Sequence, residues 1–171
     1  MKAVRGGLTL VAITLLLSCG KASKLTPLLP DAPDGWKAQG RASTVDESGI
    51  GHSSTRSYVP TNGSAGMGAQ KVIVQILMGE KGADQKQLQA MALESNAMFK
   101  ERKQLAGFPA YESVPLPGND THSLDILPAS GKWVQIVAYK GGPEWENGEN
   151  RKQIVSAFAA KVDLKKIAAQ E

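Results

Sequence analysis

The sequence is poor in the features that most often identify an extracellular scaffold, a membrane span or a nucleic-acid-binding surface. It contains a single cysteine, Cys19, so no disulfide can form within the chain. Its longest apolar run, residues 8–17, has ten residues, whereas a helix that spans a bilayer needs about 20. Lysines and arginines never follow one another more than two at a time. The dense basic patch that a nucleic acid requires is therefore missing.

The first residues combine a basic start with the short apolar run. Lys2 and Arg5 precede residues 8–17, and small or polar residues follow from Ser18 onward. This layout is typical of a secretory signal, so residues 1–18 are predicted to be a targeting segment outside the fold. An ordinary cleavable signal that happens to include a cysteine is the simpler alternative.

The four residues Leu16-Leu17-Ser18-Cys19 resemble the lipobox of bacterial lipoproteins. The resemblance implies that Cys19 is the lipid attachment site, that the signal is cut before it, and that fatty-acyl chains such as palmitate hold the protein at a membrane. Gly20 stands where an aspartate would favour inner-membrane retention in enterobacterial lipoproteins. The implied location is the cell envelope, on the periplasmic side of the outer membrane.

Removal of the 18-residue signal leaves 153 of the 171 residues, the size of one domain. The charge falls from +4 to +2 because Lys2 and Arg5 leave with the signal. Residues 19–34 contain three prolines and show neither helical nor strand periodicity, so they are predicted to form a lipid-anchored tether. Residues 35–171 are predicted to form a single globular domain.

Three strands are predicted in the first half of this domain, at residues 36–42, 53–59 and 71–78. The last has five Val, Ile and Leu residues among eight, which is typical of a strand covered on both faces. Asn62-Gly63 predicts the turn of a hairpin between the second and third strands.

A helix is predicted over residues 84–103. Asp84 and Gln87 form a capping-box type of start, and Arg102-Lys103 place cations in the last turn. The residues between them that share one apolar face at helical spacing are Leu88, Met91, Ala92, Met98 and Phe99.

The second half returns to strands, at residues 107–114, 122–127 and 132–140. Residues 128–131 join the last two as a hairpin. Asn150 is predicted to cap a final helix, and Asp163 to begin a short turn beyond it.

The expected order, three strands, a helix, three strands and a helix, indicates an α+β fold with a mainly antiparallel sheet flanked by two helices. The stretches LLPDAPDGW (residues 28–36) and GFPAY (residues 107–111), within this layout, resemble secreted bacterial proteins with a PsbP-like α/β/α sandwich fold. The resemblance covers residues 28–168. It implies a fold and an accessory role, and it transfers no site residue.

No catalytic or metal-binding constellation is predicted. Residues 63–68 have the glycine spacing of a P-loop but lack its lysine and precede a strand, so a hairpin loop is favoured. Ser64 lacks the nucleophile elbow, and only His52 and His122 could act as its base. Asp120 and His122 share one face of a strand while Asp125 points the other way, which disfavours a metal site. We therefore expect no catalytic residue, no metal and no cofactor.

Trp145, flanked by Glu144 and Glu146 in a glycine-rich loop, is a candidate partner-binding residue if it is exposed, since tryptophan is a favoured interface anchor. Packing as a lid on the following helix is the alternative.

The leading hypothesis is a lipid-anchored, non-enzymatic protein that binds a protein partner or an envelope component, with no nucleic acid involved. The alternatives are a carrier or sensor of a small apolar ligand, with Met91, Met98 and Phe99 lining a pocket, and a hydrolase using His52 or His122.

Overall fold

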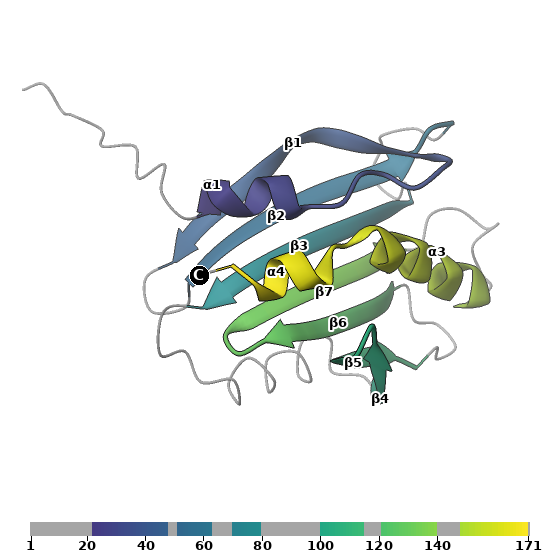
Figure 1. The fold of residues 1–171 in the computed structure, drawn as a ribbon. Helices are drawn as coiled ribbons and strands as arrows, with labels where there is room; N and C mark the ends of the chain where they lie inside the picture. The colour runs from purple at the N-terminus through teal and green to yellow at the C-terminus, as the bar shows by residue number, and fades with distance from the viewer. Residues whose placement is uncertain are drawn as a thin grey trace, which may run out of the picture.

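The computed structural model describes residues 22–47, 51–62, 70–79, 100–114, 121–139 and 148–170. Its main feature is a seven-stranded sheet in the order β1-β2-β3-β7-β6-β5-β4, in which all paired strands are antiparallel (Figure 1). The strands are β1 (Trp36–Glu47), β2 (Gly51–Pro60), β3 (Lys71–Gly79), β4 (Lys100–Leu105), β5 (Phe108–Ser113), β6 (Thr121–Ala129) and β7 (Lys132–Tyr139).

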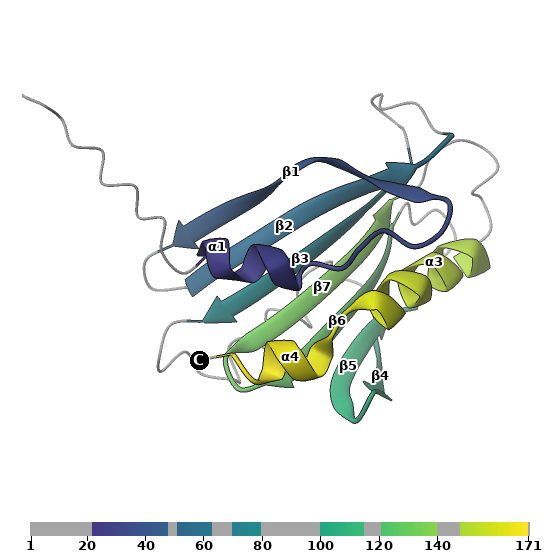
Figure 2. The same ribbon diagram turned by 45° about the horizontal axis from the view of Figure 1, so that its top comes forward.

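The described helical elements all lie on one face of this sheet, as Figure 2 shows. They are α1 (Ala22–Leu25), the 3-10 turn η1 (Thr26–Leu28), α3 (Gly148–Lys161) and α4 (Leu164–Ala168). Helices α3 and α4 cover the middle of the sheet, whereas α1 and η1 cover β1 and β2.

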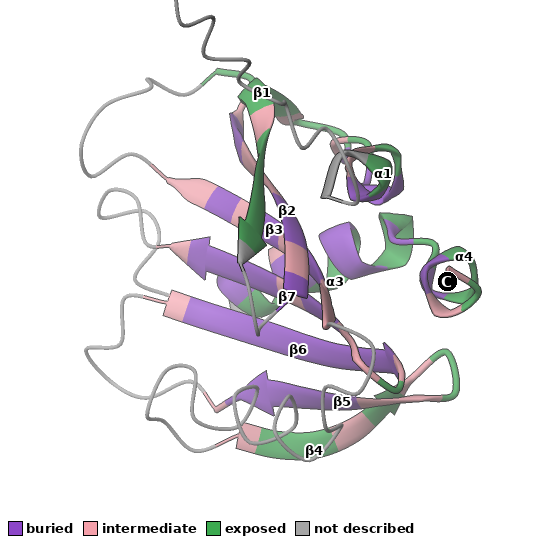
Figure 3. Cartoon of the chain, turned by 90° about the vertical axis from the view of Figure 1, so that its left-hand side faces the viewer, coloured by how far each residue is buried: buried purple, intermediate pink, exposed green. Residues whose placement is uncertain are grey.

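The main core lies between the helices and the sheet. Alternate residues of β3 and β7 point into it, and the register sets Val74 of β3 opposite Ile136 of β7. From α3, Phe158 contributes a ring with 0% exposure that meets Tyr58 of β2 edge-on at 4.8 Å. A smaller apolar cluster on the opposite face contains Leu77, Tyr111, Leu127 and Trp133. Figure 3 shows that β6 and β7 are mostly buried, whereas β1, at the sheet edge, is mostly exposed.

The predicted α+β sandwich is wrong, and with it the resemblance to the PsbP-like fold. In the described part of the chain the fold is mainly β, an antiparallel sheet with short helices on one face. Residues 84–99 of the predicted central helix lie outside the described residues. Its predicted last turn is strand β4, in which Arg102 pairs with Tyr111 of β5. Four described strands, β4 to β7, therefore follow β3, whereas the sequence predicted three strands after it.

The helix was mispredicted at this end because lysines that suit the last turn of a helix also suit a strand when ion-pair partners lie on neighbouring strands. Lys100 pairs with Asp125 at 2.7 Å, and Lys103 pairs with Glu112 at 2.7 Å. Such contacts across a sheet override intrinsic propensity and cannot be read from a local window.

The predicted tether at residues 19–34 is also wrong from Leu25 onward. Leu25, Leu28 and Leu29 are 2%, 7% and 6% exposed and belong to the main core. Their spacing places them on one side of a helical turn. The Tyr58 hydroxyl donates to the Pro30 carbonyl at 2.5 Å, which fixes this segment to β2. The globular unit therefore begins before residue 35.

The other predicted strands are confirmed, most with longer ends, and β6 and β7 form the predicted hairpin. The final helix begins at Gly148, before the predicted cap Asn150. Asp163 caps α4 as predicted, since its carboxylate accepts the Lys166 backbone N–H at 2.9 Å.

Candidate functional site

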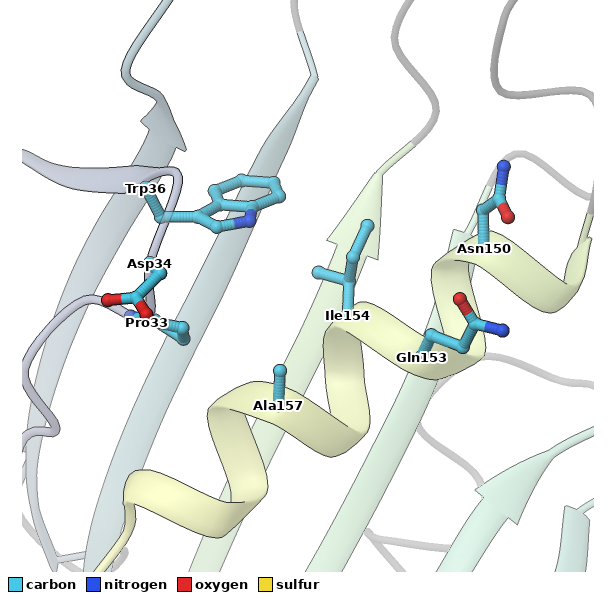
Figure 4. A pocket seen from close by; sticks show the side chains of 7 residues that line it. All are labelled: Pro33, Asp34, Trp36, Asn150, Gln153, Ile154 and Ala157. Carbon is cyan, nitrogen blue, oxygen red and sulfur yellow. The ribbon is translucent and has the colours of Figure 1, made fainter.

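An open groove of about 500 Å³ lies where the segment before β1 faces α3. Pro33, Asp34 and Trp36 line one side, and residues of α3 line the other (Figure 4). The α3 residues are Asn150, Gln153, Ile154 and Ala157. Figure 4 shows the indole of Trp36 extending toward α3, while Ile154 and Ala157 rise from the helix toward it.

Local backbone structure sets the position of Trp36. Gly35 has φ +82°, a conformation that residues with a Cβ rarely adopt, and the Trp36 N–H donates to the Pro33 carbonyl at 3.0 Å. The Thr61 N–H, directly after β2, donates to the Gly35 carbonyl at 2.9 Å. These contacts turn the chain tightly into β1 and deliver the indole to the edge of the core.

The indole is also held by its ring contact. Trp36 meets Phe158 edge-on, with ring centroids 5.4 Å apart and planes at 80°. Such aromatic pairs contribute about 0.5–1.5 kcal/mol beyond area burial. Trp36 remains partly exposed, so it is a rigid aromatic side chain that solvent can reach.

The chemistry of the groove suits binding. Pro33, Ile154 and Ala157 supply apolar surface, while Asp34, Asn150 and Gln153 add a carboxylate and two amides. An apolar lining with a few polar groups that fix orientation is the usual composition of a binding site. None of the seven lining residues is a serine, cysteine or histidine, the usual nucleophiles and bases of hydrolases.

A polar network lies apart from the groove, in β4, β5 and β6. Glu112 Oε1 faces His122 Nε2 at 3.1 Å, and Lys103 Nζ donates to Glu112 Oε2 at 2.7 Å. Burial of Glu112 raises the pKa of its carboxyl, but hydrogen bonds from His122 and Lys103 and the Lys103 charge outweigh it and lower this pKa to about 2. Glu112 therefore carries its charge at neutral pH.

The same histidine also faces a serine, which raises the question of a hydrolytic triad. Ser113 Oγ lies 3.4 Å from His122 Nδ1, and the Ser123 N–H donates to that oxygen at 2.8 Å. However, His122 is 1% and Ser113 4% exposed. A substrate could not reach this hydroxyl, so we interpret the network as structural.

A second buried network lies on the opposite face of the sheet. Asp125 accepts hydrogen bonds from Lys100 Nζ at 2.7 Å, Trp133 Nε1 at 2.9 Å and Gln135 Nε2 at 2.9 Å. The side chains of Lys100 and Asp125 are 1% and 0% exposed. Burial raises the pKa of Asp125, while these three donors oppose the shift. The carboxylate is thus fully engaged within the fold.

His52, the other candidate base, pairs across strands with Asp46. Its Nδ1 lies 2.6 Å from Asp46 Oδ1, and both side chains are partly exposed, at 20% and 31%. The two residues face each other in the register of the β1–β2 hairpin. This is a surface pair.

Most of the candidate residues predicted from the sequence lie outside the described part of the chain. Cys19, Ser64, Met91, Met98 and Phe99 lie outside the described residues, as do residues 63–68 and Asp120. The partner-binding candidates Glu144, Trp145 and Glu146 also lie outside. His122 and Asp125 do point to opposite faces of β6, as predicted, since their partners Glu112 and Trp133 lie on opposite faces.

Sequence reasoning missed the groove and both buried networks. The PDGW stretch that positions Trp36 is a local signal, but α3, on the other side of the groove, begins more than a hundred residues later. Among the residues that the structure describes, no group of three His, Cys, Asp or Glu side chains is placed to hold a metal ion. No helix in the described ranges is long and apolar enough to cross a membrane.

Comparison with known proteins adds no relative. No protein-family model matches the chain, and no curated protein matches its sequence.

Proposed function

We propose that the chain is a lipid-anchored extracytoplasmic binding protein, without catalytic activity, that engages a protein partner or an envelope component through the groove between Trp36 and α3. Cys19 is the proposed lipid attachment site, in the lipobox-like sequence Leu16-Leu17-Ser18-Cys19. The proposed location is the bacterial cell envelope, with the periplasmic side of the outer membrane favoured by Gly20.

The observation that carries the binding proposal is the accessibility of Trp36 beside a polar rim. Its ring is fixed against Phe158 yet borders an open groove with Asp34, Asn150 and Gln153. A rigid aromatic side chain next to hydrogen-bonding groups loses little conformational entropy on binding, which favours recognition. In contrast, His122, Glu112 and Asp125 are buried and already hydrogen-bonded.

The alternatives gain no specific support from the described residues. Met91, Met98 and Phe99, which would line the pocket of a carrier, lie outside the described residues, and the described layer between the sheet and α3 is filled by side chains such as Tyr58, Ile136 and Phe158, each 0% exposed. The hydrolase hypothesis requires a histidine within reach of a serine and of substrate, and His122 meets only the first condition.

Affinity capture from membrane fractions tests the proposal with two matched arginine variants. Ala157→Arg fills the groove, whereas Ser156→Arg adds the same side chain at a neighbouring exposed position of α3 that does not line it. We expect the wild type and Ser156→Arg to enrich the same component in stoichiometric amount, and Ala157→Arg to lose it. Equal recovery by both variants, or no enrichment by the wild type, would contradict groove-mediated binding.

A further inference from the structure

One end of the sheet gathers both described termini of the chain. Lys132, at the start of β7, pairs with Met78 of β3, which in turn pairs with His52 at the start of β2. Lys132 Nζ donates to the carbonyl of Ala168 at 2.7 Å and also to that of Gln170, so the end of α4 is fixed to this end of the sheet. We call it the β7-start end.

Helix α1 begins at the same end. The segment that follows it runs along β2, because Thr26 Oγ1 lies 3.0 Å from Ser54 Oγ and the Tyr58 hydroxyl donates to Pro30 further on. The order of these contacts places Ala22 near the start of β2 and residue 35 near its end. Figures 1 and 3 show α1 and α4 on the same face, with the C-terminus beside them at this end.

Covalent geometry ties Cys19 to the β7-start end. Cys19 is three positions before Ala22, the first residue of α1, so their Cα atoms lie at most about 11 Å apart, however the chain is arranged. Strand β3 alone has nine residues and spans about 27 Å toward the opposite end. An acyl group on Cys19 would therefore hold the β7-start end next to a bilayer.

This end also presents basic side chains from both termini. Lys24 of α1 and Lys165 and Lys166 of α4 are exposed. Two of the carboxylates at this end have partners within the fold: Asp163 accepts the Lys166 backbone N–H at 2.9 Å, and Asp46 faces His52 at 2.6 Å, while Glu47 ends β1 beside them. Segments about 140 residues apart in sequence thus place like charges at one end of the sheet.

We propose that the β7-start end is the surface that lies against the bilayer, with Lys24, Lys165 and Lys166 contacting anionic phospholipid headgroups. The orientation directs the other end, with the Trp36 groove, away from the membrane and toward a partner. This inference rests on the proposed lipid anchor at Cys19. Each lysine near an anionic surface strengthens binding by about fivefold, so three are enough to orient a domain that is already anchored.

Quenching of single fluorescent labels tests the orientation on the full acylated protein. Acylation consumes the thiol of Cys19, so an added cysteine is the only free one. Ala169→Cys places a label at the β7-start end and Asn62→Cys at the opposite end, both at exposed positions. In phosphatidylcholine vesicles with phosphatidylglycerol and a headgroup-attached quencher, we expect at least twofold stronger quenching at 169 than at 62. Equal quenching, or stronger quenching at 62, would overturn the orientation.

Charge reversal tests the role of the lysines. The triple change Lys24→Glu, Lys165→Glu and Lys166→Glu should reduce quenching at 169 by at least half. The control triple Lys37→Glu, Arg41→Glu and Lys152→Glu changes the net charge equally at other exposed positions and should leave quenching unchanged. Equal effects of both triples, or no effect of the first, would overturn headgroup contact, with circular dichroism verifying the fold of each variant.

Two further outcomes separate the possible failures. If the label at 169 is not quenched by headgroups in lipid vesicles but is shielded from a soluble quencher in native envelope membranes, a protein covers this end. That result overturns the headgroup proposal. If Cys19→Ala fractionates with membranes as the wild type does, the proposed lipid anchor itself fails. An acylated protein whose two labels are quenched equally contradicts the orientation alone.

Discussion

At the scale of single residues, the ion pair between Lys100 and Asp125 is almost fully withdrawn from solvent. Charges buried in this way are tolerated only when each has partners, because desolvation costs several kcal/mol per ion. Trp133 and Gln135 supply the remaining donors to Asp125. The pair consequently links β4, at the sheet edge, to the central strands β6 and β7.

We predict that Lys100→Met lowers the free energy of unfolding by about 3–5 kcal/mol, because it leaves the Asp125 carboxylate buried without its cation. Lys100→Met combined with Asp125→Asn should recover part of this loss, since an asparagine oxygen still accepts from Trp133 and Gln135. Urea unfolding at pH 7 measures both. Arg102→Met, at an exposed position of the same strand, is the control, and an equally small effect of Lys100→Met would refute the prediction.

The ionisation of Glu112 is expected to make the stability of the fold sensitive to acid. Its pKa of about 2 in the folded protein lies below the ordinary value of 4.5, so ionised Glu112 favours the folded state. This contribution is complete above about pH 4.5 and is lost as the pH falls from there toward 2. We expect it to amount to about 3 kcal/mol, as the side chain is only 9% exposed.

Urea unfolding between pH 5 and pH 2 measures this loss. Glu112→Gln should be less stable than the wild type at pH 5 and should show a shallower decline toward pH 2. Glu101→Gln provides the matched control, because Glu101 pairs with Glu112 in the register but is exposed. A wild-type decline no steeper than that of Glu112→Gln would argue against the role of this carboxylate.

At the scale of elements, the segment from Leu25 to Leu29 behaves as part of the core. The stretch 19–34 around it contains three prolines and two lysines, which suggested a tether, yet Leu25, Leu28 and Leu29 belong to the main core, and α1 packs on β1 and β2. The sequence contains the helical spacing of these leucines, but a single turn is too short for periodicity to identify a helix.

We predict that Leu25→Ala lowers the free energy of unfolding by about 2–4 kcal/mol, because it creates a cavity at a residue with 2% exposure. Lys24→Ala, at the exposed neighbouring position, should change it by less than about 0.5 kcal/mol. Thermal and urea unfolding compare the two variants. Identical stabilities would indicate that the segment is a tether after all.

At the scale of the whole molecule, an anchor at Cys19 and a domain that starts at α1 would form one closely coupled unit. We predict that radiolabelled fatty acid enters the wild-type protein and not Cys19→Ala, because the thiol is the acceptor in the lipobox resemblance. Immunoprecipitation after labelling of growing cells measures the incorporation. Absence of label from both proteins would refute the lipoprotein hypothesis.

Strands were the most predictable part of the molecule. Short runs rich in β-branched, aliphatic and aromatic residues located β2, β3 and β7, and the turn at residues 128–131 joined β6 to β7. These signals depend on neighbours in the sequence. The positions of β4 and of the leucines before β1 depend on partners far along the chain, and for this reason they were mispredicted.

The candidate groove shows the same division. A local turn at Gly35 delivers Trp36, and helical periodicity places Ile154 on a partly buried face of α3. Trp36 and Ile154 line the same groove because the ring of Phe158, also on α3, contacts both Trp36 and Tyr58. No window of the sequence contains this contact.

The sequence by itself determined where the strands other than β4 lie, the cap of α4 at Asp163 and the hypothesis of an anchor at Cys19, because each follows from chemistry within a few residues. Only the tertiary structure decided the mainly-β architecture, the burial of Lys100 with Asp125 and the end of the sheet at which α1 begins. The physical reason is that sheet order and burial are fixed by contacts between distant segments, whose free energy depends on the whole packed chain.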